Sequence, residues 1–303
     1  MIQDHISGIA DEIALQPAAV QATVSLLRQG ATIPFIARYR KEATGNLDEV
    51  AITAIRDRLS RLEELDARKA TVLKSLETHG HLTDELKQKV ISAADMASLE
   101  DIYLPYRPKR RTKAMIAREK GLEPLALKIL EQSEQDPLQL AAEFLDPEKD
   151  VVSTDDALEG ARHIIAEIIN EDPAAREKMR DLYFAKGIIQ TRVVSGKEAE
   201  GAKYKDYFDW QEPAARAPSH RILAMRRGEK ETVLNLRIAP PEQDALALLE
   251  TLFVKGDTAA SMQVHLAVQD CYKRLLSHSM ETEIRLATKQ RAENKAIEVF
   301  ARN

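Results

Sequence analysis

The sequence of 303 residues has a single cysteine, Cys271, so it can form neither an internal disulfide nor a zinc site built from several thiolates. No apolar run approaches the roughly 20 residues that a membrane-spanning helix needs. The first residues, MIQDHISGIADEIALQ, lack the basic start and apolar centre of a secretion signal. These absences together favour a cytoplasmic protein without a membrane partner.

Positive charge is not in excess either. The net charge is −5 and the isoelectric point is about 5.9, which argues against binding a polyanion over the whole surface. A local basic patch stays compatible with this balance, because mainly charges within about 10 Å of a phosphate act on it at cellular salt. The hydrophobic share of 44% and the charged share of 31% predict a globular chain with one large or two ordinary domains.

Helical patterns fill most of the chain, and the scarcity of glycine, 11 residues, agrees with them. Pro17 and Gly30 bound one expected helix, following the preference for proline at helix starts and glycine after helix ends. A long helix is expected over 47–78, with a buried stripe formed by Ile55, Leu59, Leu62, Leu65, Leu73 and Leu76. Later helices are expected to begin with a capping box at Ser153 and Asp156 and with the pair Asp172–Pro173.

Two regions depart from the helical pattern. Residues 32–46, TIPFIARYRKEATGN, are expected to be non-helical because of their breakers. Residues 188–194 and 202–210 are rich in β-branched and aromatic side chains and predict a β-hairpin, with a third strand over 231–239. We therefore predict a mainly α, multi-helix scaffold with one small three-stranded element near 188–238. The expected domains are 1–187 and 188–303, and the last helix has so little apolar surface that it is expected to lead into another domain.

No motif for catalysis stands out. Gly196–Lys197 is followed by Glu198, where a phosphate-binding loop requires Ser or Thr, and no nucleophile elbow is present. His163 and Glu167 are four residues apart and could share a metal, but such pairs are more often surface contacts on a helix. The sequence predicts no catalytic residue, no metal, no cofactor and no small-molecule substrate.

The stretch 101–121, DIYLPYRPKRRTKAMIAREKG, gathers positive charge after an aromatic, proline-bounded turn. Its cations are Arg107, Lys109, Arg110, Arg111, Lys113, Arg118 and Lys120. Arginine suits phosphate because its fork donates two hydrogen bonds, and tyrosine offers a face on which an unpaired base can stack. These residues are the candidate nucleic-acid-binding site, with Arg226 and Arg227 as a second group.

The local structure of this stretch leaves two interpretations open. A capping box at Ser98 and Asp101 is expected to start a short helix, after which prolines stiffen the arm that presents the arginines. In the alternative, Tyr103, Leu104 and Tyr106 belong to the core, and the cations solubilise a loop or pair with acids such as Glu100. A smaller group, Arg38, Arg40 and Lys41, is interpreted as structural ion pairs that hold residues 32–46 against the core.

Three stretches together resemble the bacterial Tex family of transcription accessory proteins, and the resemblance spans essentially the whole chain. They are GATIPFIARYRKEATGNLDE (30–49), SLEDIYLPYRPKRRTKAMIAREKGLEPLA (98–126) and KYKDYFDWQEPAARAPSHRILAMRRGEKETVL (203–234). The resemblance implies a helix-turn-helix-like N-terminal region followed by a central helical region. In longer family members an RNase H-like domain, helix-hairpin-helix modules and an RNA-binding OB-fold domain come next. The chain is therefore expected to be an N-terminal fragment that ends before the RNase H-like domain.

The resemblance also implies a function and a location in the cell. Tex proteins are cytoplasmic and similar in architecture to a eukaryotic elongation factor that binds nucleosomes and RNA polymerase. We expect a non-catalytic helical scaffold that binds nucleic acid, RNA or DNA, although the main RNA-binding domain is expected to be missing from this chain. The alternative is a protein-interaction scaffold that docks RNA polymerase or a ribosome-associated partner through its cations.

Overall fold

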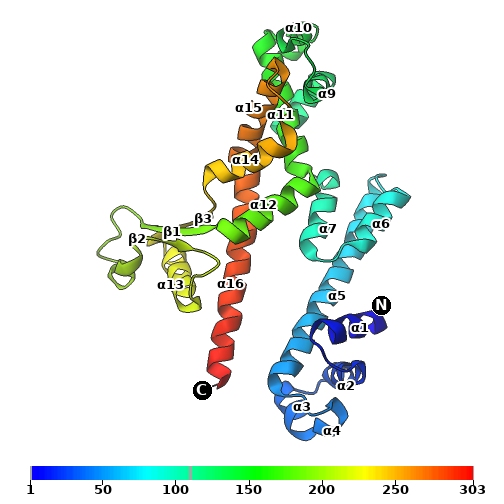
Figure 1. Cartoon of the computed structure of the whole chain (residues 1–303), viewed down its shortest axis with the longest axis vertical. Helices are drawn as coiled ribbons and strands as arrows, with labels where there is room; N and C mark the ends of the chain where they lie inside the picture. The colour runs from blue at the N-terminus through cyan, green and yellow to red at the C-terminus, as the bar shows by residue number, and fades with distance from the viewer. Residues whose placement is uncertain (1, 109–110, 303) are drawn as a thin grey trace. The chain divides into compact units, whose positions relative to one another are not determined.

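The computed structural model describes residues 2–108 and 111–302, and it confirms the mainly helical fold. The chain divides into two compact units, Met1–Tyr106 and Arg107–Asn303, which are described separately (Figure 1). The predicted domain boundary at 187/188 lies within the second unit, and that division stays a prediction, as does the helix-turn-helix-like character of the N-terminal region.

The first unit is built along one long helix, α5, whose span of 30 residues confirms the prediction for 47–78. Shorter helices cover its two halves with separate apolar clusters, one centred on Ile9, Val20 and Ile52 and the other on Val72 and Leu99. The elements of this unit are α1 (Ile2–Glu12), α2 (Pro17–Arg28), α3 (Ile33–Tyr39), α4 (Lys41–Thr44), α5 (Glu49–Thr78), α6 (Asp84–Ser92), α7 (Met96–Tyr103) and the 3₁₀ turn η1 (Leu104–Tyr106).

Two local predictions for this unit are wrong. Residues 32–46 are largely helical, because Pro34 lies in the first turn of α3, where its missing N–H costs no hydrogen bond. Gly45, with φ of 68°, ends α4 in the left-handed conformation that glycine tolerates. The capping box of α7 lies at Asp95 and Ser98, three residues earlier than expected.

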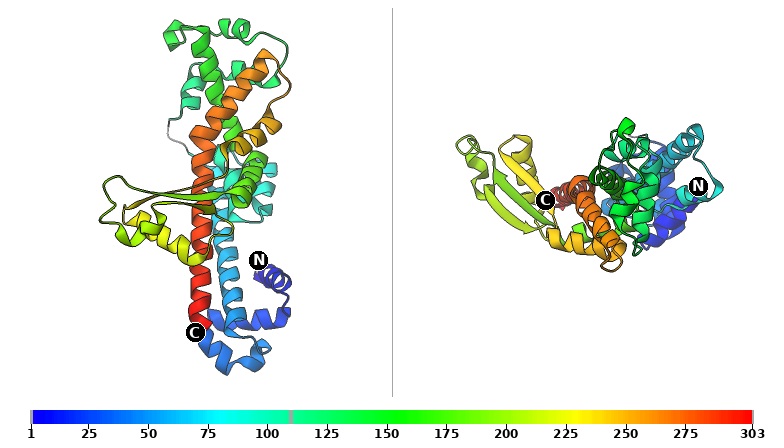
Figure 2. Two further views of the ribbon diagram at one scale, coloured as in Figure 1. Left: turned by 60° about the vertical axis from the view of Figure 1, so that its left-hand side comes forward. Right: turned by 90° about the horizontal axis from the view of Figure 1, so that it is seen from above.

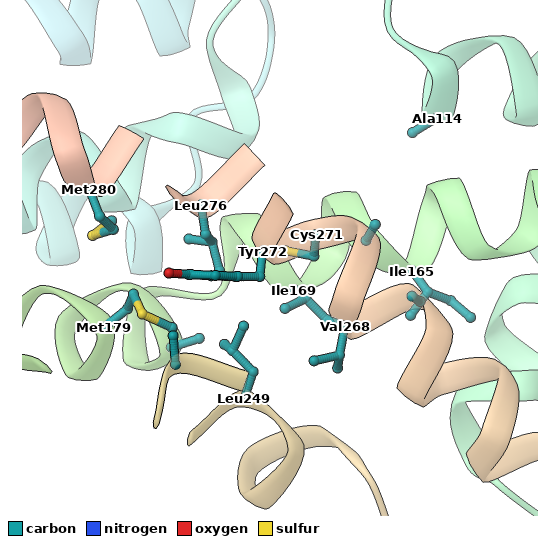
Figure 3. Close-up of a cluster of buried hydrophobic side chains, with 14 of the residues drawn as sticks. Ala114, Ile165, Ile169, Met179, Leu249, Val268, Cys271, Tyr272, Leu276 and Met280 are labelled. Atoms are coloured by element: carbon teal, nitrogen blue, oxygen red, sulfur yellow. The ribbon is translucent and has the colours of Figure 1, made fainter. Parts of the chain in front are cut away.

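The second unit packs around α11, which contacts α8, α9, α10 and α15. Its start at Ser153 with the Asp156 capping box is confirmed, and so is the Asp172 N-cap of α12. Side chains from α11, α12, α14 and α15 meet in the core, where Ile169, Met179, Leu249 and Val268 converge (Figure 3). The helices before the sheet are α8 (Lys113–Glu119), α9 (Glu123–Glu131), α10 (Pro137–Ala142), the 3₁₀ turn η2 (Pro147–Lys149), α11 (Thr154–Glu171) and α12 (Pro173–Lys186).

A continuous helical run ends the chain. It consists of α15 (Ala259–Cys271), a π-helical turn η4 (Tyr272–Leu276) and α16 (Ser277–Arg302), and it follows α14 (Glu242–Phe253). Along η4 and α16 the buried positions recur every four residues, at Leu276, Met280, Ile284, Thr288 and Ala292. No helix of the described part of the chain is long and apolar enough to cross a membrane.

The predicted three-stranded element is present as an antiparallel sheet in the order β2-β1-β3. Its strands are β1 (Ile188–Val193), β2 (Asp209–Pro213) and β3 (Leu234–Ala239), with the 3₁₀ helix η3 (Ala202–Tyr207) and α13 (Ser219–Lys230) between them. The strand expected over 202–210 therefore begins later than predicted, because Ala202–Tyr207 curl into η3. Figure 2 shows α13 lying against the sheet.

Side chains of α16 cover the edge of β3. The backbone N–H of Ile238 donates to the Glu281 carboxylate at 3.0 Å, and the carbonyl of Leu236 accepts from Arg285 at 2.6 Å. Since unpaired strand edges promote pairing with other chains, this pair of side chains one helical turn apart closes off β3.

Candidate nucleic-acid interface

The predicted cationic stretch lies at the start of the second unit, and its residues 107–113 are called the arm here. The Thr112 hydroxyl accepts the Met115 N–H at 3.0 Å and caps α8, so the arm enters the helix at a fixed point. Arg107 is exposed, and among the described residues no ion pair involves it. Lys109 and Arg110 lie outside the described residues.

Arg111 and Lys113 are both exposed. The Arg111 guanidinium lies 2.7 Å from the Glu119 carboxylate, and both side chains face solvent. Exposed pairs of this kind contribute about 0–1 kcal/mol, so Arg111 can exchange its partner readily. Lys113 is 3.4 Å from His163 Nε2 on α11, and the pKa of His163 is lowered by burial and by the charge of Lys113.

Arg118 has a structural role. Its guanidinium binds the carboxylate of Glu167 on α11, and it also contacts Glu123 at 3.0 Å. The Glu167 side chain is 8% exposed, and its other oxygen accepts from the Thr112 hydroxyl at 3.1 Å. A buried carboxylate of this kind needs its cation, so Arg118 holds α8 on α11.

Lys120 is likewise engaged with the fold. Its ammonium donates to the backbone carbonyl of Asp150 at 2.7 Å and lies 3.1 Å from the carboxylate of that residue. With Lys113 and His163 it lines an open hollow of about 320 Å³ between α8 and α11, together with Asp150, Asp156 and Glu159. Because both acidic and basic side chains line the hollow, it does not present a surface of one charge.

The second predicted group lies on α13. Arg226 pairs with Glu229 at 2.9 Å, and Glu229 also binds Arg285 of α16, so this arginine belongs to a network that fastens two helices. Arg227 is exposed. Figure 1 shows α13 beside the sheet, where it contacts β3 and α16, whereas α8 packs on α11.

The two tyrosines of the stretch differ. Tyr103 is buried, its hydroxyl is 2.8 Å from that of Ser75, and Arg68 lies over its ring at 5.6 Å. It is therefore a core residue, as the alternative interpretation expected. Tyr106 is at the surface, with its ring 5.7 Å from that of His81.

The histidine and glutamate considered as a metal pair have separate partners, and the single cysteine is buried. His163 faces Lys113 and Glu159, whereas Glu167 binds Arg118, so the two do not form a metal pair. Within the described ranges no group of three or more metal-ligating side chains occurs. Burial raises the pKa of the Cys271 thiol, which keeps it protonated and unreactive.

Sequence reasoning missed an aromatic surface on α3. Phe35 and Tyr39 are 40% and 70% exposed, and their ring centroids are 5.5 Å apart. The cations Arg38, Arg40 and Lys41 lie beside them and are all exposed. The spacing of the two aromatics by four residues would have indicated a shared helical face, but the segment was expected to be non-helical.

The chain is thus a mainly helical protein with one small sheet. Its surface carries exposed cations in the arm and exposed aromatic rings on α3. A family model described as Tex central region-like matches residues 132–300, and one described as Tex-like protein N-terminal domain matches 3–77. The chain belongs to the Tex family.

Curated relatives extend this assignment. Protein YhgF of Escherichia coli is 42% identical over 306 residues, covering 97% of this chain and 40% of its own length. The transcriptional accessory protein Tex of Neisseria gonorrhoeae is 40% identical over 302 residues, with the same coverage. S1 RNA-binding domain-containing protein 1 of Homo sapiens is 24% identical over 315 residues, covering 99% of this chain and 31% of its own length. The chain thus spans about 40% of the bacterial relatives' length.

Proposed function

We propose that this chain is the non-catalytic helical scaffold of a transcription accessory protein and that it contacts nucleic acid directly. The observation that carries the proposal is the exposure of three cations of the arm, Arg107, Arg111 and Lys113. A relative is named a transcriptional accessory protein, which supports a role in transcription and hence in the cytoplasm.

The nine predicted contact residues divide by their environment. Arg118, Lys120 and Arg226 are engaged in the fold and contribute to binding only by positioning their neighbours. Arg107, Arg111, Lys113 and Arg227 are the ones able to reach a phosphate. Lys109 and Arg110 remain part of the proposal because of their position in the sequence alone.

RNA and DNA are both compatible with phosphate contacts, because such contacts carry no base information. One relative is named for an S1 RNA-binding domain, which supports RNA as a ligand of the longer proteins. We propose that regions of the longer proteins outside this chain recognise the bases, and that the arm contacts the phosphate backbone.

A second function has its own observation. Leu127, Leu138 and Leu145 are exposed around α9 and α10, and apolar side chains gathered at a surface are typical of protein contacts. In that alternative the chain is a protein-interaction scaffold that docks RNA polymerase or a ribosome-associated protein.

The test measures binding of the chain to a labelled single-stranded RNA, a single-stranded DNA and a duplex at several salt concentrations. The variant Arg107→Ala/Arg111→Ala/Lys113→Ala is compared with Lys178→Ala/Lys205→Ala/Lys255→Ala, which removes the same charge from exposed positions elsewhere in the second unit.

The slope of log affinity against log salt is expected to become shallower by roughly 2 to 3 in the first variant only. Equal slopes in the two variants would remove the arm as the site. Recovery of RNA polymerase with the chain from nuclease-treated lysate, lost on Leu127→Ser/Leu138→Ser but not on the arm variant, would favour the alternative.

A further inference from the structure

The exposed face of α3 carries an aromatic pair that the fold itself does not use. The first unit buries Ile36 and Ala37 from the same helix, so α3 is anchored by its other side. Phe35 and Tyr39 point outward one turn apart, with ring centroids at 5.5 Å and planes inclined by 41°. Two neighbouring exposed rings form a small apolar patch, and such patches at a surface often mark a binding site.

Three exposed cations lie beside these rings, and only one of them has an ion pair among the described residues. The guanidinium of Arg40 lies 5.5 Å from the centroid of Phe35. Arg38 reaches only 4.0 Å from Glu49, and its side chain is 70% exposed. Lys41 is exposed, and the described residues supply no ion pair for it. Of the ion pairs expected to hold residues 32–46 in place, the described residues show the long pair of Arg38 with Glu49, and Arg40 makes a cation–π contact instead.

A hollow adjoins the aromatic pair. It has a volume of about 440 Å³ and lies where α2 turns into α3, lined by Leu26, Gln29, Gly30, Ala31, Thr32, Phe35 and Arg40. Its wall combines one aromatic ring, aliphatic surface and the neutral hydrogen-bonding groups of Gln29 and Thr32. Gly30 has φ of 84° and no side chain to narrow the opening.

We propose that this surface, Phe35, Arg38, Tyr39, Arg40 and Lys41 with its hollow, binds single-stranded nucleic acid. Bases stack on Phe35 and Tyr39, the hollow receives one base edge, and the three cations contact the phosphates on either side. This inference deepens the proposed function, on which it rests, and assigns it a second site in the first unit.

The chemistry favours this ligand over an acidic peptide. An aromatic ring binds the flat face of any base, and stacking contributes about 1–3 kcal/mol per base. An acidic peptide would satisfy the cations but would leave the faces of both rings exposed. Duplex DNA would meet the cations through its backbone and keep its bases stacked on one another, so neither ring would be covered.

The experiment uses the whole chain and labelled oligonucleotides of about 12 nucleotides, long enough to cover several stacked bases. The probes are oligouridine, oligothymidine, a duplex of the same length and polyglutamate. The variant Phe35→Ala/Tyr39→Ala removes the rings, and Phe184→Ala is the matched control, since Phe184 is 43% exposed on α12. Circular dichroism verifies that each variant is folded, and Phe35→Trp, which keeps a stacking ring, provides a rescue if the alanine variant unfolds.

We expect each lost ring to weaken single-strand binding by roughly 5- to 150-fold, with Phe184→Ala and Phe35→Trp near the parent affinity. Ultraviolet crosslinks to oligouridine or oligothymidine should map to α3, and the stronger of the two identifies RNA or DNA. Unchanged single-strand binding after ring removal, or tighter binding of polyglutamate than of either strand, overturns the inference.

The two proposals fail differently. If the arm variant loses binding and the α3 variant does not, the α3 site is wrong while the proposed function stands. If the α3 variant loses binding and the arm variant does not, the inference holds and the arm is not the contact site. A chain that binds no probe at low salt contradicts both.

Discussion

Arg118 of α8 binds Glu167 of α11 across a sequence separation of 49 residues, with the carboxylate almost wholly buried. Arg118, one of the predicted nucleic-acid-binding arginines, therefore stabilises the packing of α8 on α11. It also explains why charge density in a sequence overstates the charge that a surface presents.

The first prediction concerns this pair. Arg118→Ala leaves the buried Glu167 with the Thr112 hydroxyl as its described partner on α8, and we expect a loss of about 2–3 kcal/mol in the free energy of unfolding. Arg111→Ala breaks an exposed pair and is expected to cost less than about 1 kcal/mol. Denaturant unfolding followed by the fluorescence of Trp210, the single tryptophan and a member of the second unit, measures both. Equal losses would contradict the structural role of Arg118.

The second prediction concerns pH. Burial and the charge of Lys113 lower the pKa of His163 below its unfolded value of 6.5, with Arg274 acting in the same direction and Asp270 and Glu159 against it. The unfolded chain therefore binds the proton more readily, so the stability contributed by neutral His163 is present above pH 6.5 and is lost as pH falls through the folded pKa.

Two variants check this titration. His163→Asn should flatten the dependence of stability on pH below 6.5. Lys113→Gln should move the pKa of His163 back toward its ordinary value in an NMR titration, whereas Lys178→Gln on α12 should leave it unchanged. A pKa that does not respond to Lys113→Gln would show that the charge of Lys113 does not contribute to it.

The third prediction uses a glycine of α11. A Cβ at Gly160 would lie 2.3 Å from the Cδ1 atom of buried Leu122 and 3.4 Å from the Cβ atom of Ala117. Gly160→Ala is therefore expected to destabilise the second unit by about 1–2 kcal/mol, since overpacking outweighs the gain in helix propensity. Gly8→Ala in α1 meets nothing within 4 Å and should be stabilising. Calorimetry compares the two, and a stabilising Gly160→Ala would be the contrary result.

The fourth prediction tests the covered edge of the sheet. Glu281→Ala removes the acceptor of the buried Ile238 N–H, at a cost of about 1–3 kcal/mol. Amide exchange at Ile238 should accelerate with it. Glu293→Ala, which breaks an exposed pair with Lys289 on the same helix, serves as the control and should alter neither quantity. Unaltered exchange at Ile238 in Glu281→Ala would mean that the backbone group has another partner.

The predictions that succeeded rest on local chemistry. The helix over 47–78, the capping box at Ser153 and the Asp172 cap depend on residues within a few positions of one another, which a sequence displays directly. The failures have physical causes of the same kind. Pro34 was counted as a breaker although it occupies a first turn, and an aromatic run was assigned to a strand although Ala202–Tyr207 form η3.

The candidate site was harder to predict because its electrostatics are non-local. The partners of Arg118 and Lys120 come from 49 and 30 residues away, so only the fold reveals that these cations are engaged. For Arg107, Arg111, Lys113 and Arg227 the sequence and the structure agree on exposure, and binding stays a prediction. Phe35 and Tyr39 became visible as a surface only once α3 was known to be helical.

The four-residue recurrence of buried positions in α16 has a geometric consequence. An α-helix turns about 100° per residue, so each step of four advances the buried line by about 40° around the axis. From Leu276 to Ala292 the line of buried positions therefore rotates by nearly half a turn around the helix axis. Within one turn of α16, Glu283 binds Arg176 and Arg180 of α12, and Arg285 binds Glu229 of α13. A twist of α16 about its axis would thus be felt by α12 and α13 at once.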